Sequence, residues 1–207
     1  MLKIKQFAIY FLALIYISGA IGFSIYPDFF SPFTPLTLVL TTAIYLLYQP
    51  YSDSKFLFGF FMIALIGYIL EVVGVATGLV FGKYAYGDAL GIKLLEVPLI
   101  ISLNWALMIS AGFNISKTIF RSKFLIILCT ATITVGIDVL IEQIAVRLDF
   151  WEFESGMPGF HNYFGWFIIS VLCSSLFYSS LTKGTYKSSI ITLILQVMFF
   201  GSIYIFY

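Results

Sequence analysis

Long apolar stretches, separated by short polar segments, make up most of this chain, and several of them contain about 20 residues. A helix of ~20 apolar residues crosses the hydrocarbon core of a bilayer. Of the 207 residues, 61% are hydrophobic and only 10% are charged, whereas a soluble domain carries about 25% charged residues. The sequence therefore predicts an integral protein of the cell membrane, with one domain over residues 1–207 and no room for a soluble domain.

The apolar stretches predict seven membrane-spanning helices, and hence an all-α, multi-pass bundle. The second stretch is the shortest, and prolines bracket it with turns. The predicted spans are residues 7–25, 33–48, 57–80, 95–113, 124–146, 161–182 and 189–207.

Basic residues are distributed unevenly between the two sides of such a bundle. The richer side holds Lys3, Lys5, Lys55, Lys117, Arg121, Lys123, Lys183 and Lys187. The poorer side holds Lys83, Lys93 and Arg147. Because cytoplasmic loops carry an excess of Lys and Arg, this bias predicts a cytoplasmic N-terminus and an external C-terminus.

Three acidic residues fall inside predicted spans. Asp138 and Glu142 are four residues apart in the span 124–146, so they point the same way from a helix. Glu71 lies inside the span 57–80. An ionised carboxylate at the centre of a bilayer costs roughly 2.5–3.5 kcal/mol even on the mildest scale, so such residues usually have a partner or a function.

Polar residues of four spans fall in the outer half of the membrane. At a rise of about 1.5 Å per residue, Glu71 and Asp138 lie about 12–13 Å deep and Glu142 about 6 Å deep, and the polar residues of the fourth and sixth spans lie between about 15 Å deep and the outer surface. Those residues are Asn104, Trp105, His161 and Asn162. The loops 81–94 and 147–160 cover this face. The sequence therefore predicts one polar cavity, closed toward the cytoplasm by apolar helix.

Each of these polar residues also has a structural interpretation. For Glu71 the structural alternative is a bond to a neighbouring hydroxyl, and for Asp138 with Glu142 it is a polar stripe that Thr or Tyr side chains satisfy. His161 is explained by contact with water at the membrane surface. A metal site is not expected, because one His and the spacing of the acids do not supply a ligand set.

Two blocks of sequence carry a resemblance to a known family. The first runs from Glu71 to Tyr86 and continues with Leu90-Gly, Glu96-Val-Pro and Asn104-Trp105. The second holds Asp138 and Glu142, followed by Trp151-Glu-Phe, Gly156-Met-Pro-Gly and Asn162-Tyr-Phe-Gly-Trp166. Over residues 71–166 the chain resembles the carotenoid biosynthesis membrane proteins that include the carotenoid 1,2-hydratases. It has Glu142-Gln143 where other members often carry an acid followed by proline.

The resemblance implies a hydro-lyase that adds water across the terminal 1,2 double bond of an acyclic carotenoid end group. The resemblance does not choose among three kinds of substrate: lycopene-like, γ-carotene-like, and longer C50 carotenoids of the bisanhydrobacterioruberin type. The expected partners are a lipophilic carotenoid, water and membrane lipid, without nucleic acid, and association with other carotenoid enzymes is left open.

The residues themselves suggest acid catalysis. Protonation of an alkene requires a dry acid, and burial favours the protonated form of a carboxyl group. We expect Asp138 to donate the proton and Glu142 to hold and deprotonate the water, with Glu71 as the alternative donor. The aromatic candidates for stabilising the cation and binding substrate are Trp105, Tyr84, Tyr86 and Trp166. No redox or nucleotide cofactor is expected, because the chain has no G-x-G-x-x-G after a strand and no P-loop.

Two other functions fit the same residues. A lycopene cyclase also protonates an end-group alkene, but an internal double bond traps the cation and the mass does not change. A proton-coupled carrier would use the acids as a relay. Against the carrier, no polar path is expected to continue to the cytoplasm, and no repeat symmetry is evident.

Overall fold

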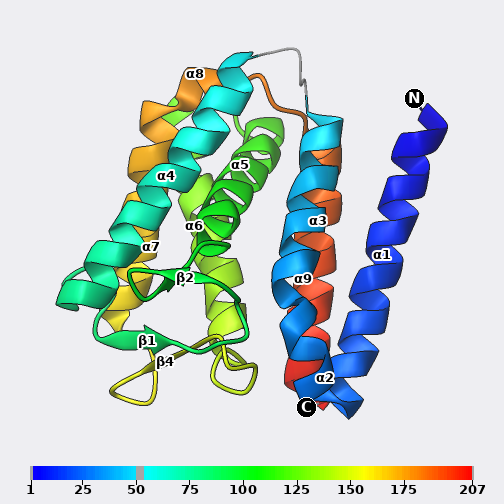
Figure 1. The fold of residues 1–207 in the computed structure, drawn as a ribbon. Coiled ribbons are helices and arrows are strands. Elements are labelled where there is room, and N and C mark those ends of the chain that lie inside the picture. The colour runs from blue at the N-terminus through cyan, green and yellow to red at the C-terminus, as the bar shows by residue number, and fades with distance from the viewer. Residues whose placement is uncertain (1, 50–53, 207) are drawn as a thin grey trace.

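A computed structural model describes residues 2–49 and 54–206, which form a bundle of long helices with short strands at one end (Figure 1). The long helices are α1 (Leu2–Ile25), α3 (Thr34–Tyr48), α4 (Ser54–Thr77), α5 (Ile101–Ile119), α6 (Lys123–Glu142), α7 (Phe160–Leu176) and α9 (Tyr186–Phe206). The short elements are α2 (Pro27–Phe30), a 3-10 turn η1 (Ser31–Phe33), α8 (Tyr178–Leu181), β1 (Tyr84–Tyr86), β2 (Lys93–Leu94), β3 (Val97–Pro98) and β4 (Trp151–Phe153).

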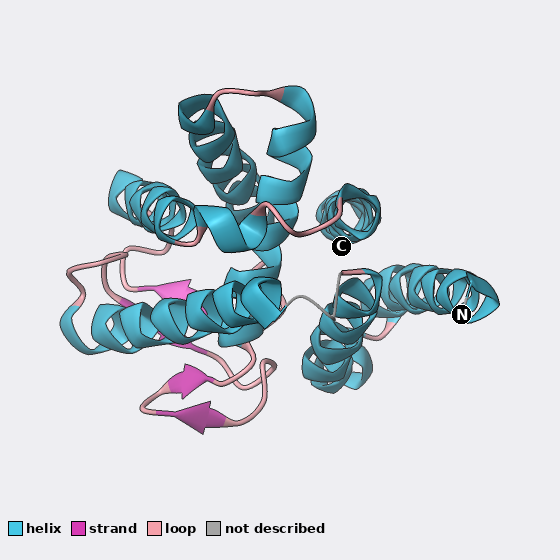
Figure 2. Ribbon diagram, turned by 90° about the horizontal axis from the view of Figure 1, so that it is seen from above, coloured by secondary structure: helices cyan, strands magenta, loops and turns pink. Residues whose placement is uncertain are grey.

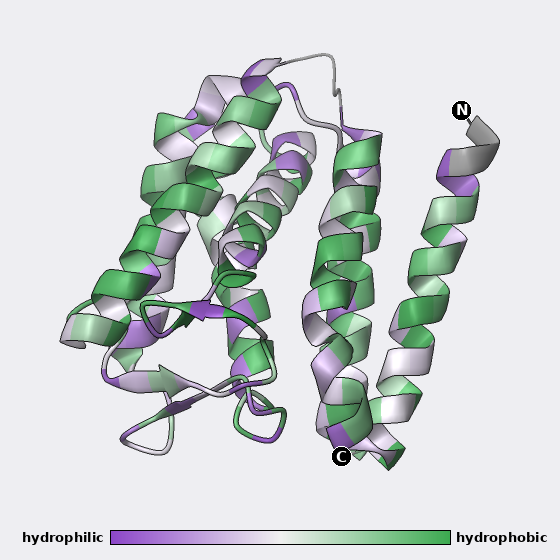
Figure 3. Cartoon of the chain, in the orientation of Figure 1, coloured by the Kyte–Doolittle hydropathy of each residue, from purple (hydrophilic) through white to green (hydrophobic). Residues whose placement is uncertain are grey.

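Several of these helices are long and apolar enough to cross a membrane, so the protein is a membrane protein. Within the described residues, five segments have this character: Lys5–Ile25, Pro27–Tyr48, Ser54–Thr77, Lys123–Glu142 and Tyr186–Phe206. Figure 3 shows hydrophobic residues along the length of the helices. Helices α5 and α7 occupy the other two predicted spans, but seven crossings and the orientation of the termini stay predictions. Tyr207, the end of the last predicted span, lies outside the described residues.

Helix α5 is less apolar than the other long helices, and its position at the centre of the bundle explains this difference. This helix packs against α3, α4, α6, α7 and α9, and most of its residues are buried. Because protein rather than lipid surrounds it, α5 can carry polar residues that hydrogen-bond to its neighbours. Ser110, Asn114 and Ser116 are all fully buried on this helix.

Several predicted spans have boundaries that the structure corrects. The helices expected at 124–146 and 161–182 end earlier, at Glu142 and Leu176. The span expected at 95–113 starts six residues later, because β2 and β3 form a hairpin before it. Leu95 and Glu96 make the two-residue turn of this hairpin, and both have positive φ angles, of 53° and 64°, as type I′ turns require. The span expected at 57–80 ends at Thr77, because Gly78 has a φ of 68°, typical of the residue that ends a helix.

The two loops on the strand side of the bundle are joined to each other. Strand β1 pairs with β4 in antiparallel register, so that Tyr84 lies opposite Phe153 and Tyr86 lies opposite Trp151. The all-α prediction therefore holds for the bundle but not for these loops. Figure 2 shows the strands gathered at one side of the helices, away from the N-terminal helix.

The opposite end of the bundle is more polar than the sequence predicted. We expected plain apolar helix there, and this expectation is wrong. Asn114 donates a hydrogen bond of 3.0 Å to the Tyr45 hydroxyl, and Gln49 donates one of 2.8 Å to Ser188 Oγ. These bonds join α3 to α5 and to α9, so buried polar side chains stabilise helix packing in that half.

Candidate active site

Glu71 on α4 is the most fully hydrogen-bonded acid in the bundle. Its Oε2 accepts hydrogen bonds from the hydroxyls of Tyr84 and Tyr86, the second at 2.8 Å. Its Oε1 accepts a bond of 2.9 Å from Trp105 Nε1. The side chain is only 2% exposed. Three donors therefore hold both oxygens of this buried carboxyl group in place.

A glycine one helical turn before Glu71 makes this arrangement possible. A Cβ atom on Gly67 would lie 2.4 Å from Trp105 Cγ. Because Gly67 has no side chain, the Trp105 indole can lie against α4 with its N–H directed at Glu71. The local sequence of α4 therefore creates the space and places the acceptor on the same face.

Asp138 and Glu142 on α6 are linked by one amide group. Asn162 on α7 donates a hydrogen bond of 3.1 Å to Asp138 Oδ2 and one of 3.0 Å to Glu142 Oε1. Trp151 of β4 donates a bond of 2.9 Å to Glu142 Oε2. Asp138 is 3% exposed, whereas Glu142, at the end of α6, is only partly buried. The predicted pair is thus held in position by Asn162.

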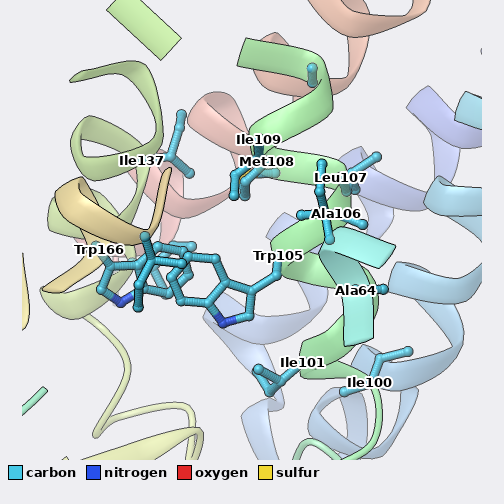
Figure 4. Close-up of a cluster of buried hydrophobic side chains, with 14 of the residues drawn as sticks. Ala64, Ile100, Ile101, Trp105, Ala106, Leu107, Met108, Ile109, Ile137 and Trp166 are labelled. Carbon is cyan, nitrogen blue, oxygen red and sulfur yellow. The ribbon is translucent and has the colours of Figure 1, made fainter. Parts of the chain in front are cut away.

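Two tryptophans stack between these two groups of acids. The rings of Trp105 and Trp166 lie 3.7 Å apart between centroids and are inclined by 10°, and Figure 4 shows their indoles face to face. Phe81 packs against both of them. This aromatic wall is nearly dry, because Trp105 is fully buried and Trp166 is 8% exposed.

The two tyrosines that bond to Glu71 stay protonated at neutral pH. Burial raises the pKa of Tyr84 far above its ordinary value, and the charges of Glu71 and Glu142 raise it further. Burial and the Glu71 carboxylate raise the pKa of Tyr86 in the same direction. Both phenols are therefore stable hydrogen-bond donors, and strand β1 supplies them from outside the membrane-spanning helices.

A small cavity of about 20 Å³ lies between Glu71 and Glu142. One water molecule needs about 10–15 Å³ of such space and two to four polar partners. The partners available here include the two acids, Asn104 and Asn162. Phe81, Trp166 and Phe153 supply apolar walls. The cavity therefore has the size and the polar groups for one water molecule.

A second cavity, of about 470 Å³, adjoins the first. Ile101, Asn104 and Trp151 line both cavities, so the two spaces meet at these residues. The larger cavity lies mainly between α1, α3 and α9, and its walls are mostly aromatic and aliphatic side chains. Its volume is within the usual range of a small-molecule site.

The large cavity also reaches the surface of the bundle. Phe29, Phe33 and Leu36 line it and are 65%, 47% and 54% exposed. These residues belong to the segment from α2 to the start of α3, which faces lipid if the bundle is inserted as predicted. The large cavity therefore opens beside exposed apolar side chains.

The structure brings most of the predicted site residues together. Around the small cavity lie Glu71, Glu142, Tyr84, Tyr86, Asn104, Asn162 and Trp166, and Trp105 bonds to Glu71 beside it. Asp138 lines neither cavity and lies behind Asn162. His161 is exposed at the start of α7 and also lines neither.

The sequence reasoning missed several residues that shape the site. Trp151 bonds to Glu142 and separates the two cavities, although it was noticed only as part of a motif. The aromatic residues of α1 and α2 were not singled out from the sequence, yet they line the large cavity. Among the described residues, no group of three or more His, Cys, Asp or Glu side chains is arranged to hold a metal ion.

The fold and this site define a multi-pass membrane protein with buried carboxyl groups beside an apolar cavity that is open to its surroundings. The sequence profile of the carotenoid biosynthesis proteins matches residues 33–207. The chain belongs to this carotenoid biosynthesis family.

One curated relative is the bisanhydrobacterioruberin hydratase of Haloarcula japonica, which is 27% identical over 143 residues. The match covers 62% of this chain and 46% of the relative, so the chain spans about half the length of that protein. No solved structure matches the chain.

Proposed function

We propose that this protein is a carotenoid hydratase, which adds water across the terminal 1,2 double bond of an acyclic carotenoid end group. The observation that carries the proposal is a pair of neighbouring cavities: space for one water molecule between Glu71 and Glu142 lies next to a large apolar space. Membership of the carotenoid biosynthesis family and the hydratase named among its relatives support the same reaction.

Glu142 is the proton donor in this proposal. It lines the small cavity next to the large apolar one, whereas Asp138 lines neither cavity, so the donor role predicted for Asp138 passes to Glu142 in this proposal. Protonated Glu142 transfers its proton to the less substituted alkene carbon, and a tertiary cation forms on the neighbouring carbon. Water adds to that carbon and returns a proton to the Glu142 carboxylate, so the acid is regenerated in each turnover.

Glu71 and the tryptophan stack stabilise the cation. The Glu71 carboxyl oxygens, held by three donors, line the small cavity and supply negative partial charge in a buried site, where electrostatic stabilisation is strongest. Trp166 presents part of its indole to the small cavity, and an indole face attracts a cation. Asn104, whose side chain forms no hydrogen bond with the described residues, is free to orient the water.

Asp138 is a positioning residue in this scheme. It accepts one N–H of Asn162 while Glu142 accepts the other, so the Asn162 amide cannot rotate without losing a bond to a carboxyl group. The amide thereby fixes the direction of the Glu142 carboxyl. A well-oriented acid is needed because misplacement of reacting groups by about 1 Å can cost ~100-fold in rate.

Expression in a host that accumulates acyclic carotenoids tests the proposal. Hydration adds the mass of water at each end that reacts, and mass spectrometry of the extracted pigments measures it. The Glu142→Gln variant, expressed at the same level, is the control and should leave the pigments unchanged. A product of unchanged mass with a cyclic end group would instead show cyclase activity, and unmodified pigment would contradict both enzymes.

A further inference from the structure

Asp149 lies in the loop between α6 and β4, and its carboxylate binds the backbone of the other loop on the strand side. Its Oδ2 accepts a hydrogen bond of 2.7 Å from the amide of Asp88 and one of 3.2 Å from the amide of Ala89. Asp149 has a φ of 54°, a left-handed conformation that Asp and Asn adopt more readily than most other residues with side chains. One carboxylate oxygen therefore joins the loop 147–160 to the loop 81–94.

Gly87 leaves the space that this contact needs. A Cβ atom on Gly87 would lie 2.2 Å from Asp149 Oδ1 and 2.3 Å from the Asp149 carbonyl oxygen. The amide of Gly87 also donates a hydrogen bond of 3.0 Å to the carbonyl of Phe150. Three consecutive amides, those of residues 87–89, thus bond to Asp149 and Phe150. The two loops approach more closely here than a residue with a side chain at position 87 would allow.

The strand pair that follows these contacts reaches both acids of the small cavity. Figure 1 shows β1 and β4 together at one end of the bundle, and Trp151 lies opposite Tyr86 in their register. Tyr86 donates a hydrogen bond of 2.8 Å to Glu71, and Trp151 donates one of 2.9 Å to Glu142. The two rings also pack edge to face, with centroids 6.0 Å apart. One pair of opposite residues therefore supplies a donor to each acid.

Lys93 connects the Asp149 contact to Tyr86. Its Nζ donates a hydrogen bond of 2.8 Å to the Tyr86 carbonyl and one of 2.9 Å to the Asp88 carboxylate. Asp88 is thus held at its amide by Asp149 and at its side chain by Lys93. On the other strand, only Phe150 stands between Asp149 and Trp151 in the chain. The position of Asp149 consequently bears on both donors.

We propose that Asp149 is a positioning residue of the candidate active site, which acts by fixing the strand pair that supplies a donor to each acid. Asp149 itself lines neither cavity. The kinetic consequences of this inference rest on the proposed hydration, whereas the geometry can be measured without any reaction. A displaced Trp151 would leave the Glu142 carboxyl free to turn, and misplacement of reacting groups by about 1 Å can cost ~100-fold in rate.

Three substitutions of Asp149 separate its hydrogen bonds from its backbone conformation. Asp149→Asn keeps an oxygen that can accept both amide bonds, and Asn tolerates a positive φ. Asp149→Gly also tolerates this φ but has no acceptor. Asp149→Ala has neither property. If the hydrogen bonds position the strands, Asp149→Asn should resemble the wild type, and both other variants should lose the effect.

The indole N–H signals in an NMR spectrum of the purified protein in detergent micelles report the position of Trp151. The chain has three tryptophans, so three such signals are expected, and Trp151→Phe identifies the one that bonds to Glu142. This signal should move in Asp149→Gly and Asp149→Ala and stay in place in Asp149→Asn. The Trp166 signal reports on the helices and should stay in place in all three. An unmoved Trp151 signal in Asp149→Ala would overturn the proposal, and so would an equal movement of the Trp166 signal, because it would show general loss of structure.

The kinetics of carotenoid hydration provide the second measurement. Asp149→Gly and Asp149→Ala should lower kcat about tenfold with little change in KM, because the acids are disturbed and the apolar cavity is not. The matched control is Lys83→Met, which removes an exposed ion pair with Glu154, 3.7 Å long, between the same two loops. Such pairs contribute little, so this variant should keep the wild-type kcat.

The outcomes distinguish this inference from the proposed function. A wild-type kcat in Asp149→Gly and Asp149→Ala would overturn the positioning role, and so would a loss in Asp149→Asn as large as that in Asp149→Ala. A wild-type protein that hydrates no carotenoid would contradict the proposed function instead. In that case the Trp151 signal alone decides whether Asp149 positions the strand pair.

Discussion

The indole of Trp105 stacks on that of Trp166, with ring centroids 3.7 Å apart, and at the same time donates its N–H to Glu71. One side chain of the central helix α5 therefore contacts α7 through its ring face and α4 through its nitrogen. Trp105 therefore holds both Glu71 and the aromatic stack in place, so a substitution that moves Glu71 also moves the stacked rings.

Substitution of Trp105 by Phe separates the two contacts. An aromatic ring remains, but Glu71 Oε1 loses its donor, and a buried acceptor left without a partner costs about 1–3 kcal/mol. We expect a loss of stability of that size in denaturant unfolding in micelles, together with a lower hydration rate. Trp166→Phe keeps the bond to Glu71 and should destabilise the protein less. Equal losses in both variants would argue against the importance of the Glu71 bond.

Gly67→Ala tests the space that α4 leaves for the indole. The added Cβ would lie 2.4 Å from Trp105 Cγ, so the indole must shift away from Glu71. Overpacking of this kind typically costs about 1–3 kcal/mol. The control is Gly136→Ala in α6, where the added carbon meets nothing within 4 Å. Thermal unfolding should show a lower midpoint only for Gly67→Ala, and a normal midpoint there would contradict the contact.

Glu142→Gln and Asp138→Asn distinguish the proton donor from the residue that positions it. Loss of a general acid typically lowers the rate by about 10²–10⁴-fold, so Glu142→Gln should be nearly inactive. Asp138→Asn keeps an acceptor oxygen for Asn162 and should retain a larger part of the activity. Pigment hydration per unit of membrane protein is the measurement. An inactive Asp138→Asn beside an active Glu142→Gln would return the donor role to Asp138.

The raised pKa of Tyr84 and Tyr86 predicts how stability changes at alkaline pH. In the unfolded chain these phenols ionise near their ordinary pKa of 10, whereas in the folded protein they stay neutral above it. The contribution of the two neutral phenols to the unfolding free energy is therefore complete below about pH 10, and it is lost as the pH rises toward their pKa in the folded protein. The unfolding free energy should fall above pH 10. The fall should be smaller in the double variant Tyr84→Phe, Tyr86→Phe, and ultraviolet phenolate absorbance should show two fewer late-titrating groups.

Much of the site was predictable from residue type and spacing. Buried acids are rare in membrane helices, so Glu71, Asp138 and Glu142 were recognisable as candidate site residues, and the motifs with Asn104, Trp105, Asn162 and Trp166 added their neighbours. The prediction did not extend to the small cavity or to the bridging amide of Asn162. Both depend on how far each helix is rotated about its axis, which hydropathy does not report.

The roles within the site were harder to predict than its members. Asp138 was taken as the donor because it is the deeper acid of its pair, but Glu142 lines the cavity and Asp138 does not. His161 stands next to Asn162 in the chain, yet it is exposed while Asn162 is buried, because successive residues of a helix point about 100° apart.

By itself, the sequence determined that this is a membrane protein of long apolar helices with three acids among them, because hydropathy and helix length are local properties of the chain. The tertiary structure alone decided which acids share a cavity, that β1 joins β4 over them, and that α1, α3 and α9 form an apolar space leading to the site. Those features arise from contacts between residues far apart in the chain, and their formation depends on helix packing and loop pairing rather than on local composition.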